Sequence, residues 1–300
     1  MSTTNNHTAM AFAVACTGIA TYAGMDVAMK GLALEIGAYN ALLWRSLISV
    51  AVSALLYLPG RTGWPGIEVL KLHMWRGFII TIMAFLFFWG LKHLPVAEAI
   101  GLSFIAPLIA LYLAAVILKE KIENQSIAAS ITGLIGAVII ISGRLSSEYD
   151  EEAAKGIAAI LLSAVLYAYN LILQRQQAVL ARPVEIAFFQ FGTVAILLGV
   201  LSPFLAIIPA ASNVPGLAGA SLLGIVSLLM MSWAYARATA NTLIPVEYTA
   251  FIWAAILGWM VFGETVTLTT ILGTVFIVAG CLVAAWKRVD HVDHIETTAV

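Results

Sequence analysis

A pair of opposite charges, Asp26 and Lys30, lies at the end of a long apolar stretch near the start of the chain. Positions four apart share one face of a helix, and an acid that precedes a base is the more favourable order. Charged side chains are costly in apolar surroundings, so the pair needs a reason. Two interpretations are open: an interfacial pair that reaches water at the last turn of a helix, or a functional group that acts with a third charge.

The third charge is Arg45, which lies near the middle of the next apolar stretch. An ionisable residue within a membrane segment usually has a function and faces the protein interior. The guanidinium offers a planar set of donors that suits a carboxylate or a phosphate. We therefore expect either a substrate contact at Arg45, for which Asp26 competes with the substrate, or a purely structural tie between Asp26 and Arg45.

Glu247 is a second candidate acid, and it stands beside Tyr248 just after Pro245. The start of a helix stabilises a carboxylate and tolerates proline, so a structural role at a helix start is one interpretation. The other is a contact for a cationic substrate group or for a coupling proton, because burial favours the protonated form of a carboxyl group.

Several aromatic and amide side chains are candidates to line a substrate cavity. Flat rings combined with one or two charged groups suit a zwitterion or a heteroaromatic solute. The aromatic members have an alternative role, since Trp and Tyr also anchor helices at the membrane interface. The candidates are Tyr169, Asn170, Gln190, Trp233, Tyr235 and Tyr248.

The composition places all these residues in a membrane protein. Hydrophobic residues make up 62% of the 300 positions and charged residues 10%, with a mean hydropathy of +0.99. A soluble domain carries about 25% charged residues, so most of this surface must face lipid. The net charge of -1 gives no basic surface for nucleic acid. The two cysteines lie in apolar runs and indicate neither a disulfide framework nor a thiolate metal site.

About 20 apolar residues span a bilayer as a helix, and this length predicts ten crossings. Lys and Arg are more frequent on the side of the two termini, which favours cytoplasmic termini in an inner membrane. The predicted segments are 9–29, 38–58, 73–91, 95–118, 125–142, 156–173, 184–207, 215–236, 242–262 and 268–286.

The two halves of the chain repeat each other. An offset of 145 places Tyr22–Met25 over Tyr167–Asn170 and Arg45 over Gln190, and an offset of 144 places Trp89 over Trp233. We call this pairing the repeat alignment, with 145 for the first two segments and 144 for the next three. Five crossings in each half turn the second half upside down, and inverted repeats are typical of secondary transporters whose substrate site lies between the halves.

The predicted fold is therefore all-α, with ten transmembrane helices arranged as two inverted five-helix repeats. In this arrangement Glu120 and Glu264 lie on opposite membrane faces, so we interpret them as residues that cap the helices following them rather than as paired catalytic acids. The expected organisation is a cytoplasmic tail (1–8), a first repeat (9–142), an acidic outer loop (143–155), a second repeat (156–286) and a second cytoplasmic tail (287–300).

The stretch 76–122, "RGFIITIMAFLFFWGLKHLPVAEAIGLSFIAPLIALYLAAVILKEKI", resembles the EamA-type repeat of the drug/metabolite transporter superfamily. That repeat has an arginine opening its third helix, a proline midway along the fourth and a glutamate after it, matched here by Arg76, Pro107 and Glu120. The stretch 244–280 is similar, although Phe251 stands where the proline would fall. The resemblance implies a ten-helix carrier of amino acids, vitamins such as riboflavin, S-adenosylmethionine or other small organic solutes.

We expect a secondary active transporter that moves such a metabolite by alternating access, with the substrate, membrane lipid and coupling protons as partners. We expect a monomer or homodimer, with no catalytic residue, metal or cofactor. The histidines lie in tails or at helix ends, and no Ser/His pair stands within a predicted helix. The alternatives are an intramembrane enzyme and a membrane receptor without transport.

Overall fold

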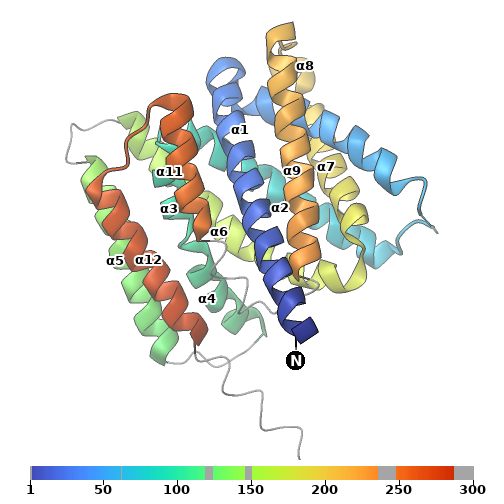
Figure 1. The fold of residues 1–300 in the computed structure, drawn as a ribbon. Helices are drawn as coiled ribbons and strands as arrows, with labels where there is room; N and C mark the ends of the chain where they lie inside the picture. Colours follow the sequence, from blue (N-terminus) through green and yellow to red (C-terminus); the bar gives the residue numbers. More distant parts are fainter. Residues whose placement is uncertain (1, 62, 119–123, 146–150, 236–247, 287–300) are drawn as a thin grey trace, which may run out of the picture.

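All regular elements of the described part of the chain are helices. The computed structural model describes residues 2–61, 63–118, 124–145, 151–235 and 248–286, and within them there is no strand. The helices are α1 (Ser2–Tyr57), α2 (Ile67–Leu91), α3 (Val96–Ser103), α4 (Ala106–Leu118), α5 (Asn124–Leu145), α6 (Glu151–Leu180), α7 (Pro183–Val200), α8 (Ser202–Leu205), a 3-10 turn (Ala211–Asn213), α9 (Val214–Tyr235), α11 (Thr249–Phe262) and α12 (Leu268–Trp286) (Figure 1).

The length and the apolar surface of these helices fit a protein that crosses the membrane several times. Among the described residues, five helical ranges are long and apolar enough to span a bilayer, and four shorter apolar helices accompany them. Large apolar side chains such as Leu55 (75% exposed) and Ile256 (44% exposed) point outward. Lipid rather than water suits such a surface. The five long ranges are Met10–Tyr57, Ile67–Leu91, Glu151–Gln174, Pro183–Val200 and Ala211–Ala234.

The first two predicted crossings form one continuous element, α1, with a kink at Gly37. The kink residue has φ 82° and ψ 151°, a conformation that favours glycine. The prediction of a loop between 29 and 38 was wrong, because residues 30–36 continue the first helix even though they include Lys30, Gly31 and Glu35, and the backbone leaves the helical conformation at Gly37. As a result, Asp26 and Lys30 do not lie in the last turn of a helix.

The fourth predicted crossing, 95–118, is divided into α3 and α4 by a turn at Phe104 and Ile105. Pro107 lies in the first turn of α4, where proline is tolerated because the first amides of a helix have no partner within it. The helix α6 extends beyond both expected ends, from Glu151 to Leu180. The residues after 173 therefore belong to the same helix as the predicted membrane segment.

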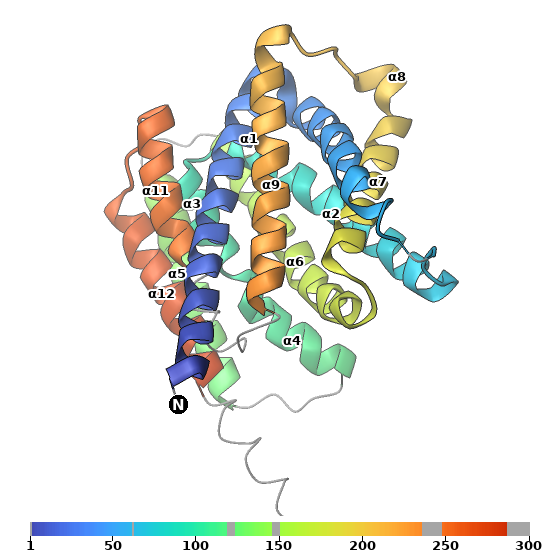
Figure 2. The same ribbon diagram turned by 45° about the vertical axis from the view of Figure 1, so that its right-hand side comes forward.

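The helices pack in a small number of close pairs. α1 packs along α9 and against α7, α2 packs along α6, and α5 packs along α12. Both ribbon views show α5 and α12 as a pair at one side, and α1 beside α9 near the middle (Figures 1 and 2). Glycines permit the α5–α12 approach, since a Cβ added at Gly273 would lie 2.5 Å from the carbonyl oxygen of Gly136.

Candidate substrate site

The two charges singled out in the sequence, Asp26 and Arg45, each have a buried polar atom that makes no hydrogen bond to the described part of the protein. Asp26 is 2% exposed, and its Oδ1 has no hydrogen-bond partner. The Nε of Arg45 is also buried and has none. The kink at Gly37 turns the second half of α1 back, and the two charges interact electrostatically without forming a direct ion pair among the described residues. Buried polar atoms are almost always satisfied, so we expect a further hydrogen-bond partner, such as water or a ligand, at these two atoms.

Helices α7 and α9 position Arg45. Its guanidinium carbon lies 5.9 Å from the centroid of the Phe191 ring on α7. On α9, a Cβ added at Gly224 would lie 3.3 Å from the guanidinium Nη2, so a glycine leaves room for the charged group. The hydroxyl of Ser221, also on α9, donates to the carbonyl oxygen of Arg45 at 3.1 Å. Three elements from both halves of the chain thus meet around this side chain.

Tyr22 and Arg76 complete this polar centre. Tyr22 precedes Asp26 by one helical turn and therefore shares its face of α1. The side chain of Tyr22 is 48% exposed and lies within electrostatic range of Asp26, Arg45 and Arg76. Because these groups come from both halves of α1 and from α2, the tyrosine faces the space between these helices. We define Tyr22, Asp26, Arg45 and Arg76 as the central cluster.

Arg76 is 4% exposed and is held by amides rather than by acids among the described side chains. Its Nε donates to Asn170 Oδ1 at 2.9 Å and its Nη2 to Gln174 Oε1 at 3.3 Å. Its Nη1 donates to Gln177 Oε1. The three amides follow one another at intervals of four and three, so one face of α6 provides all of them.

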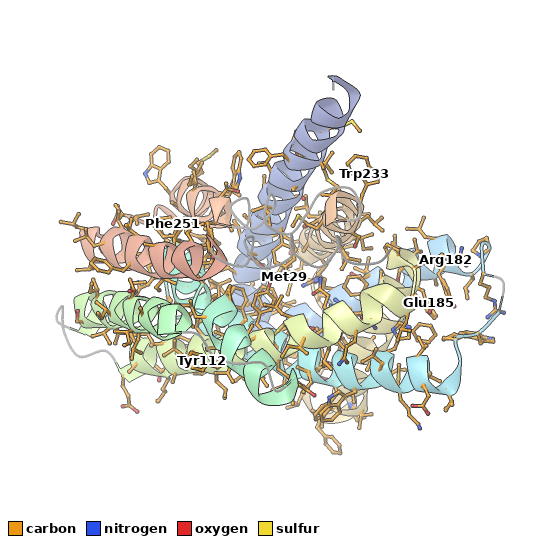
Figure 3. All side chains as sticks on the ribbon, turned by 90° about the horizontal axis from the view of Figure 1, so that it is seen from below. Met29, Tyr112, Arg182, Glu185, Trp233 and Phe251 are labelled. Carbon is orange, nitrogen blue, oxygen red and sulfur yellow. The ribbon has the colours of Figure 1, made fainter. Side chains whose placement is uncertain are left out.

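The same hydrogen-bond network continues from Gln177 to His73. The Nε2 of Gln177 contacts His73 Nδ1, and His73 Nε2 lies 3.3 Å from Glu185 Oε1 on α7. The imidazole is fully buried and stacks on Phe189, with ring centroids 4.7 Å apart and an angle of 14°. Figure 3 shows Glu185 on α7 at the side of the molecule, away from Met29 near its centre. The network therefore leads from the central cluster towards the start of α7.

Lys30 binds one group just before α3 and another just after α11. It is 5% exposed, and its Nζ donates to Glu264 and to the carbonyl oxygen of Leu94 at 2.5 Å. The Oε2 of Glu264 accepts from the backbone N–H of Val96 at 2.7 Å. Glu264 thus caps α3 and not the helix that follows it, because the turn after α11 lies against the start of α3. The interpretation of Lys30 as a water-facing interfacial residue was wrong.

Two predicted site residues lie in contacts outside the central cluster. The hydroxyl of Tyr169 accepts a hydrogen bond from Trp75 Nε1 at 3.1 Å, and Trp75 is 49% exposed at the surface of α2. Trp233 packs against Ala15 and Ala234 in the contact between α1 and α9. Neither contact brings these aromatic rings to Asp26 or Arg45.

The remaining predicted residues fall into three groups. Asn170 joins Arg76, and the Oε1 of Gln190 on α7 is buried without a partner. The ring of Tyr248 meets Phe104 edge-on, with centroids 5.2 Å apart and an angle of 90°. Glu247 and the side chain of Tyr235 lie outside the described residues.

The sequence contained signals for the residues that were not selected as site residues. Arg76 is an ionisable residue within a predicted crossing, which by itself indicates function. Tyr22 belongs to the four-residue match between the halves. His73 was interpreted as a helix-end residue, and Gln177 lay beyond the expected end of its segment. Only the true length of α6 places the glutamine opposite the histidine.

Three known proteins that are similar to this chain are all named as transporters or exporters. The pseudopaline exporter CntI of Pseudomonas aeruginosa is 27% identical over 87% of this chain and 91% of its own length. The S-adenosylmethionine uptake transporter of Rickettsia bellii is 27% identical over 70% of each chain. The riboflavin transporter of Brucella anthropi is 24% identical over 40% of this chain and 43% of its own.

A protein of known crystal structure shares the fold, with a TM-score of 0.61 at 18% identity over 94% of this chain and 99% of the other. The sequence profile of the EamA-like transporter family matches the chain twice, over residues 9–142 and 154–286. The two matches together cover most of the chain. This protein is a multi-pass membrane protein of the EamA-like transporter family, within the drug/metabolite transporter superfamily.

Proposed function

We propose that this protein is a secondary active transporter that moves a small organic metabolite across the cytoplasmic membrane. Two inverted five-helix halves would expose the central cluster alternately to each side, with protons as the coupling ion and both termini in the cytoplasm. The observation that carries this proposal is a pair of hydrogen bonds at equivalent positions of the two halves.

The first bond joins α6 to α2, where the hydroxyl of Ser163 donates to the carbonyl oxygen of Met83 at 2.9 Å. The second joins α9 to α1, where the hydroxyl of Ser227 donates to the carbonyl oxygen of Gly18 at 2.7 Å. Gly18 and Ser163 are 145 positions apart, and Met83 and Ser227 are 144 apart. These are the offsets of the repeat alignment, so the same contact occurs twice with the donor on the opposite member of the pair.

The contact between Phe104 and Tyr248 also supports two equivalent halves. These residues are 144 positions apart, and their rings touch each other. Two equivalent residues can meet only near the axis that relates the halves. In inverted-repeat transporters the substrate site lies near the midplane at this axis, beside helices that are interrupted there. The turn between α3 and α4 begins at Phe104, and α11 begins directly after Tyr248.

The helix contacts follow the same rule. The contact of α1 with α9 has its equivalent in that of α2 with α6, and the contact of α1 with α11 has its equivalent in those of α6 with α3 and α4. Three further pairs join equivalent elements to each other: α5 with α12, α3 with α11, and the second half of α1 with α7. This pattern supports ten crossings in two inverted repeats.

The chemistry of the central cluster favours a solute that carries both an anionic and a cationic group. Arg45 offers one buried donor, Nε, to a carboxylate, and Asp26 and Gln190 each offer one buried acceptor to an ammonium or amide. Asn170, Tyr248 and Glu247 are proposed as further contacts, with Glu247 at the cationic end of the solute. The names of the relatives, which include a pseudopaline exporter and an S-adenosylmethionine uptake transporter, describe small organic solutes.

Uptake into proteoliposomes tests this function. Labelled amino acids, S-adenosylmethionine, riboflavin and pseudopaline are offered with and without an imposed proton gradient. We expect saturable uptake of one class by the wild type and loss of that uptake in Arg45→Ala, while the matched lipid-facing variant Leu55→Ala keeps it. Unchanged uptake by a folded Arg45→Ala protein would remove this residue from the site. Absence of uptake and exchange in the wild type would contradict the transport function.

A further inference from the structure

We propose that His73 is the proton-binding residue that couples transport to the proton gradient, and that it controls Arg76 through the amide of Gln177. The inference rests on the proposed transport function and assigns its coupling step to named atoms. It follows from the order in which donors and acceptors alternate along the network from Arg76 to Glu185.

Arg76 determines the direction of every bond in this network. Arginine can only donate, so the oxygen of Gln177 accepts from Nη1, and the Nε2 of Gln177 is left to donate to His73 Nδ1. Nδ1 must therefore carry a lone pair. The neutral ring then holds its proton on Nε2, which lies 3.3 Å from Glu185 Oε1. The network thus binds the neutral form of the imidazole.

A second proton on the ring would break this arrangement at one defined place. It would sit on Nδ1, where it would face the N–H of Gln177, and two donors cannot share a hydrogen bond. The amide of Gln177 must then turn and present its oxygen to His73. Arg76 loses that oxygen and keeps the amides of Asn170 and Gln174. Protonation of His73 therefore frees Nη1 of Arg76 for the carboxylate of a solute.

The groups around the ring suit a histidine that changes charge. On α7, Glu185 stabilises an imidazolium and Phe189 covers one face of the ring. On α2, Arg76 lies within electrostatic range and opposes a second charge, which favours its movement towards the solute. Imidazole titrates between pH 5 and 8, where proton gradients act. The α6 side contributes the neutral Gln177.

Helix α1 contributes a further titratable group. Its Tyr57 lies within electrostatic range of Glu185, and the charges of Arg61 and Arg182 act on Tyr57 in turn. The side chain of Glu185 is 15% exposed, whereas that of His73 is 0% exposed. The acid therefore stands between the buried ring and the surface of the molecule.

The fold does not need a polar network at this place. In the repeat alignment, the equivalents of His73, Arg76 and Gln177 are Leu217, Ala220 and Leu32. All three equivalents are buried in the main hydrophobic core. The equivalent contact of α1 with α9 is thus apolar at these three positions, so packing alone does not account for the charges between α2 and α6.

The test compares exchange with accumulation in proteoliposomes, using the labelled solute that the wild type transports. Exchange at equal pH on both sides needs only substrate binding and alternation, whereas accumulation driven by a pH gradient needs coupling. We expect His73→Gln to keep exchange and to lose accumulation. We also expect the affinity of the wild type for its solute to rise as pH falls through the histidine range, and that of the variant to be independent of pH.

Two further variants keep the test decisive. The double variant His73→Leu with Gln177→Leu copies the apolar pair Leu217 and Leu32, and it should fold and behave as His73→Gln does. Glu68→Gln is the matched control: it removes an exposed acid on the same helix, paired only with Lys71 at 2.8 Å among the described residues, and should retain accumulation.

The outcomes separate the two proposals. Accumulation at the wild-type level by a folded His73→Gln or double variant would overturn the assignment of His73 and leave the transport function intact. Wild-type protein that neither exchanges nor accumulates any solute of the panel would overturn the transport function, and the coupling assignment with it.

Discussion

The contact of α2 with α6 and the contact of α1 with α9 hold equivalent places in the proposed inverted repeat, but their chemistry differs. Each contains a serine, Ser163 or Ser227, that donates to a carbonyl oxygen of the facing helix at an equivalent position. Between the start of α2 and the end of α6, this contact also carries the buried network of Arg76, Gln177 and His73. The equivalent positions of α1 and α9 are occupied by Ala220, Leu32 and Leu217.

This difference separates what the fold requires from what the function requires. Features that both contacts share, such as the serine bonds, serve to pack the helices. Features found in one contact alone, such as the charge of Arg76, are not needed to pack the helices. The chemistry of a carrier built from repeats is therefore best sought where its equivalent halves disagree.

The largest effect is expected at Arg76. Arg76→Met should lower the initial rate of solute uptake about 10- to 100-fold, since a hydrogen bond to a charged group contributes about 1.5–3 kcal/mol. The control on the apolar side is Leu217→Met, at the equivalent of His73, a volume-conserving substitution in the same contact that should leave the rate within about threefold. Equal loss in both variants, measured by labelled uptake, would abolish the functional contrast between the two contacts.

The next effect concerns a position in each of the two contacts where the backbones of the two helices come close together. A Cβ added at Gly90 would lie 2.8 Å from the carbonyl oxygen of Gly156 and 2.9 Å from Ile160, so Gly90→Ala should lower the free energy of unfolding by about 1–3 kcal/mol. At the equivalent positions, Ala234 packs against Ala15. Adding Ile160→Ala to Gly90→Ala copies that arrangement and should restore part of the loss. Thermal unfolding in detergent measures both, and absence of any rescue would argue against the equivalence.

A third effect tests the network itself. Gln177→Leu alone removes the partner of His73 Nδ1 and the partner of Arg76 Nη1, and should cost about 1–3 kcal/mol of unfolding free energy. Replacing His73 by Leu as well removes both buried polar partners, so the double variant should be more stable than the single one. The melting temperatures of the three proteins decide this. A double variant less stable than Gln177→Leu would show that the histidine stabilises the contact independently.

The smallest effect is a matched pair. Ser163→Ala and Ser227→Ala each remove one hydroxyl donor from a carbonyl that already accepts within its helix, and each should cost about 1 kcal/mol or less. The account predicts equal shifts in melting temperature for the two variants. A shift confined to one of them would mean that the two bonds are not equivalent.

Composition and periodicity were sufficient to predict an all-α membrane protein, because apolar helices of bilayer length leave a strong pattern in the sequence. The helix ends were less predictable. The residues from Lys30 to Ile36 stay helical although Lys30 and Glu35 are charged, so the kink at Gly37 replaces the expected loop. The true end of α6 at Leu180 was also missed, because the polar residues after 173 resemble a loop while they bind α2.

The candidate site was predictable only in part. The rule that buried charges in membrane segments have a function identified Asp26 and Arg45, and the structure brings both into the central cluster. The rule gives no partners, however. Glu264 was expected to cap the helix after it and instead holds Lys30 and the start of α3, more than 160 positions away. Such long-range pairs depend on the packing of helices, which local patterns do not contain.

The inverted arrangement of the halves is the central claim, and the sidedness of two equivalent loops tests it most directly. Gly63 lies in the loop before α2 and Ile208 in the loop before α9, and both are exposed. In a background with Cys16 and Cys281 replaced by alanine, each position is changed to cysteine and treated with a membrane-impermeant thiol reagent on intact cells. The account predicts labelling of Ile208→Cys from outside and of Gly63→Cys only after the membrane is opened. Labelling of both cysteines from the same side would contradict an inverted repeat.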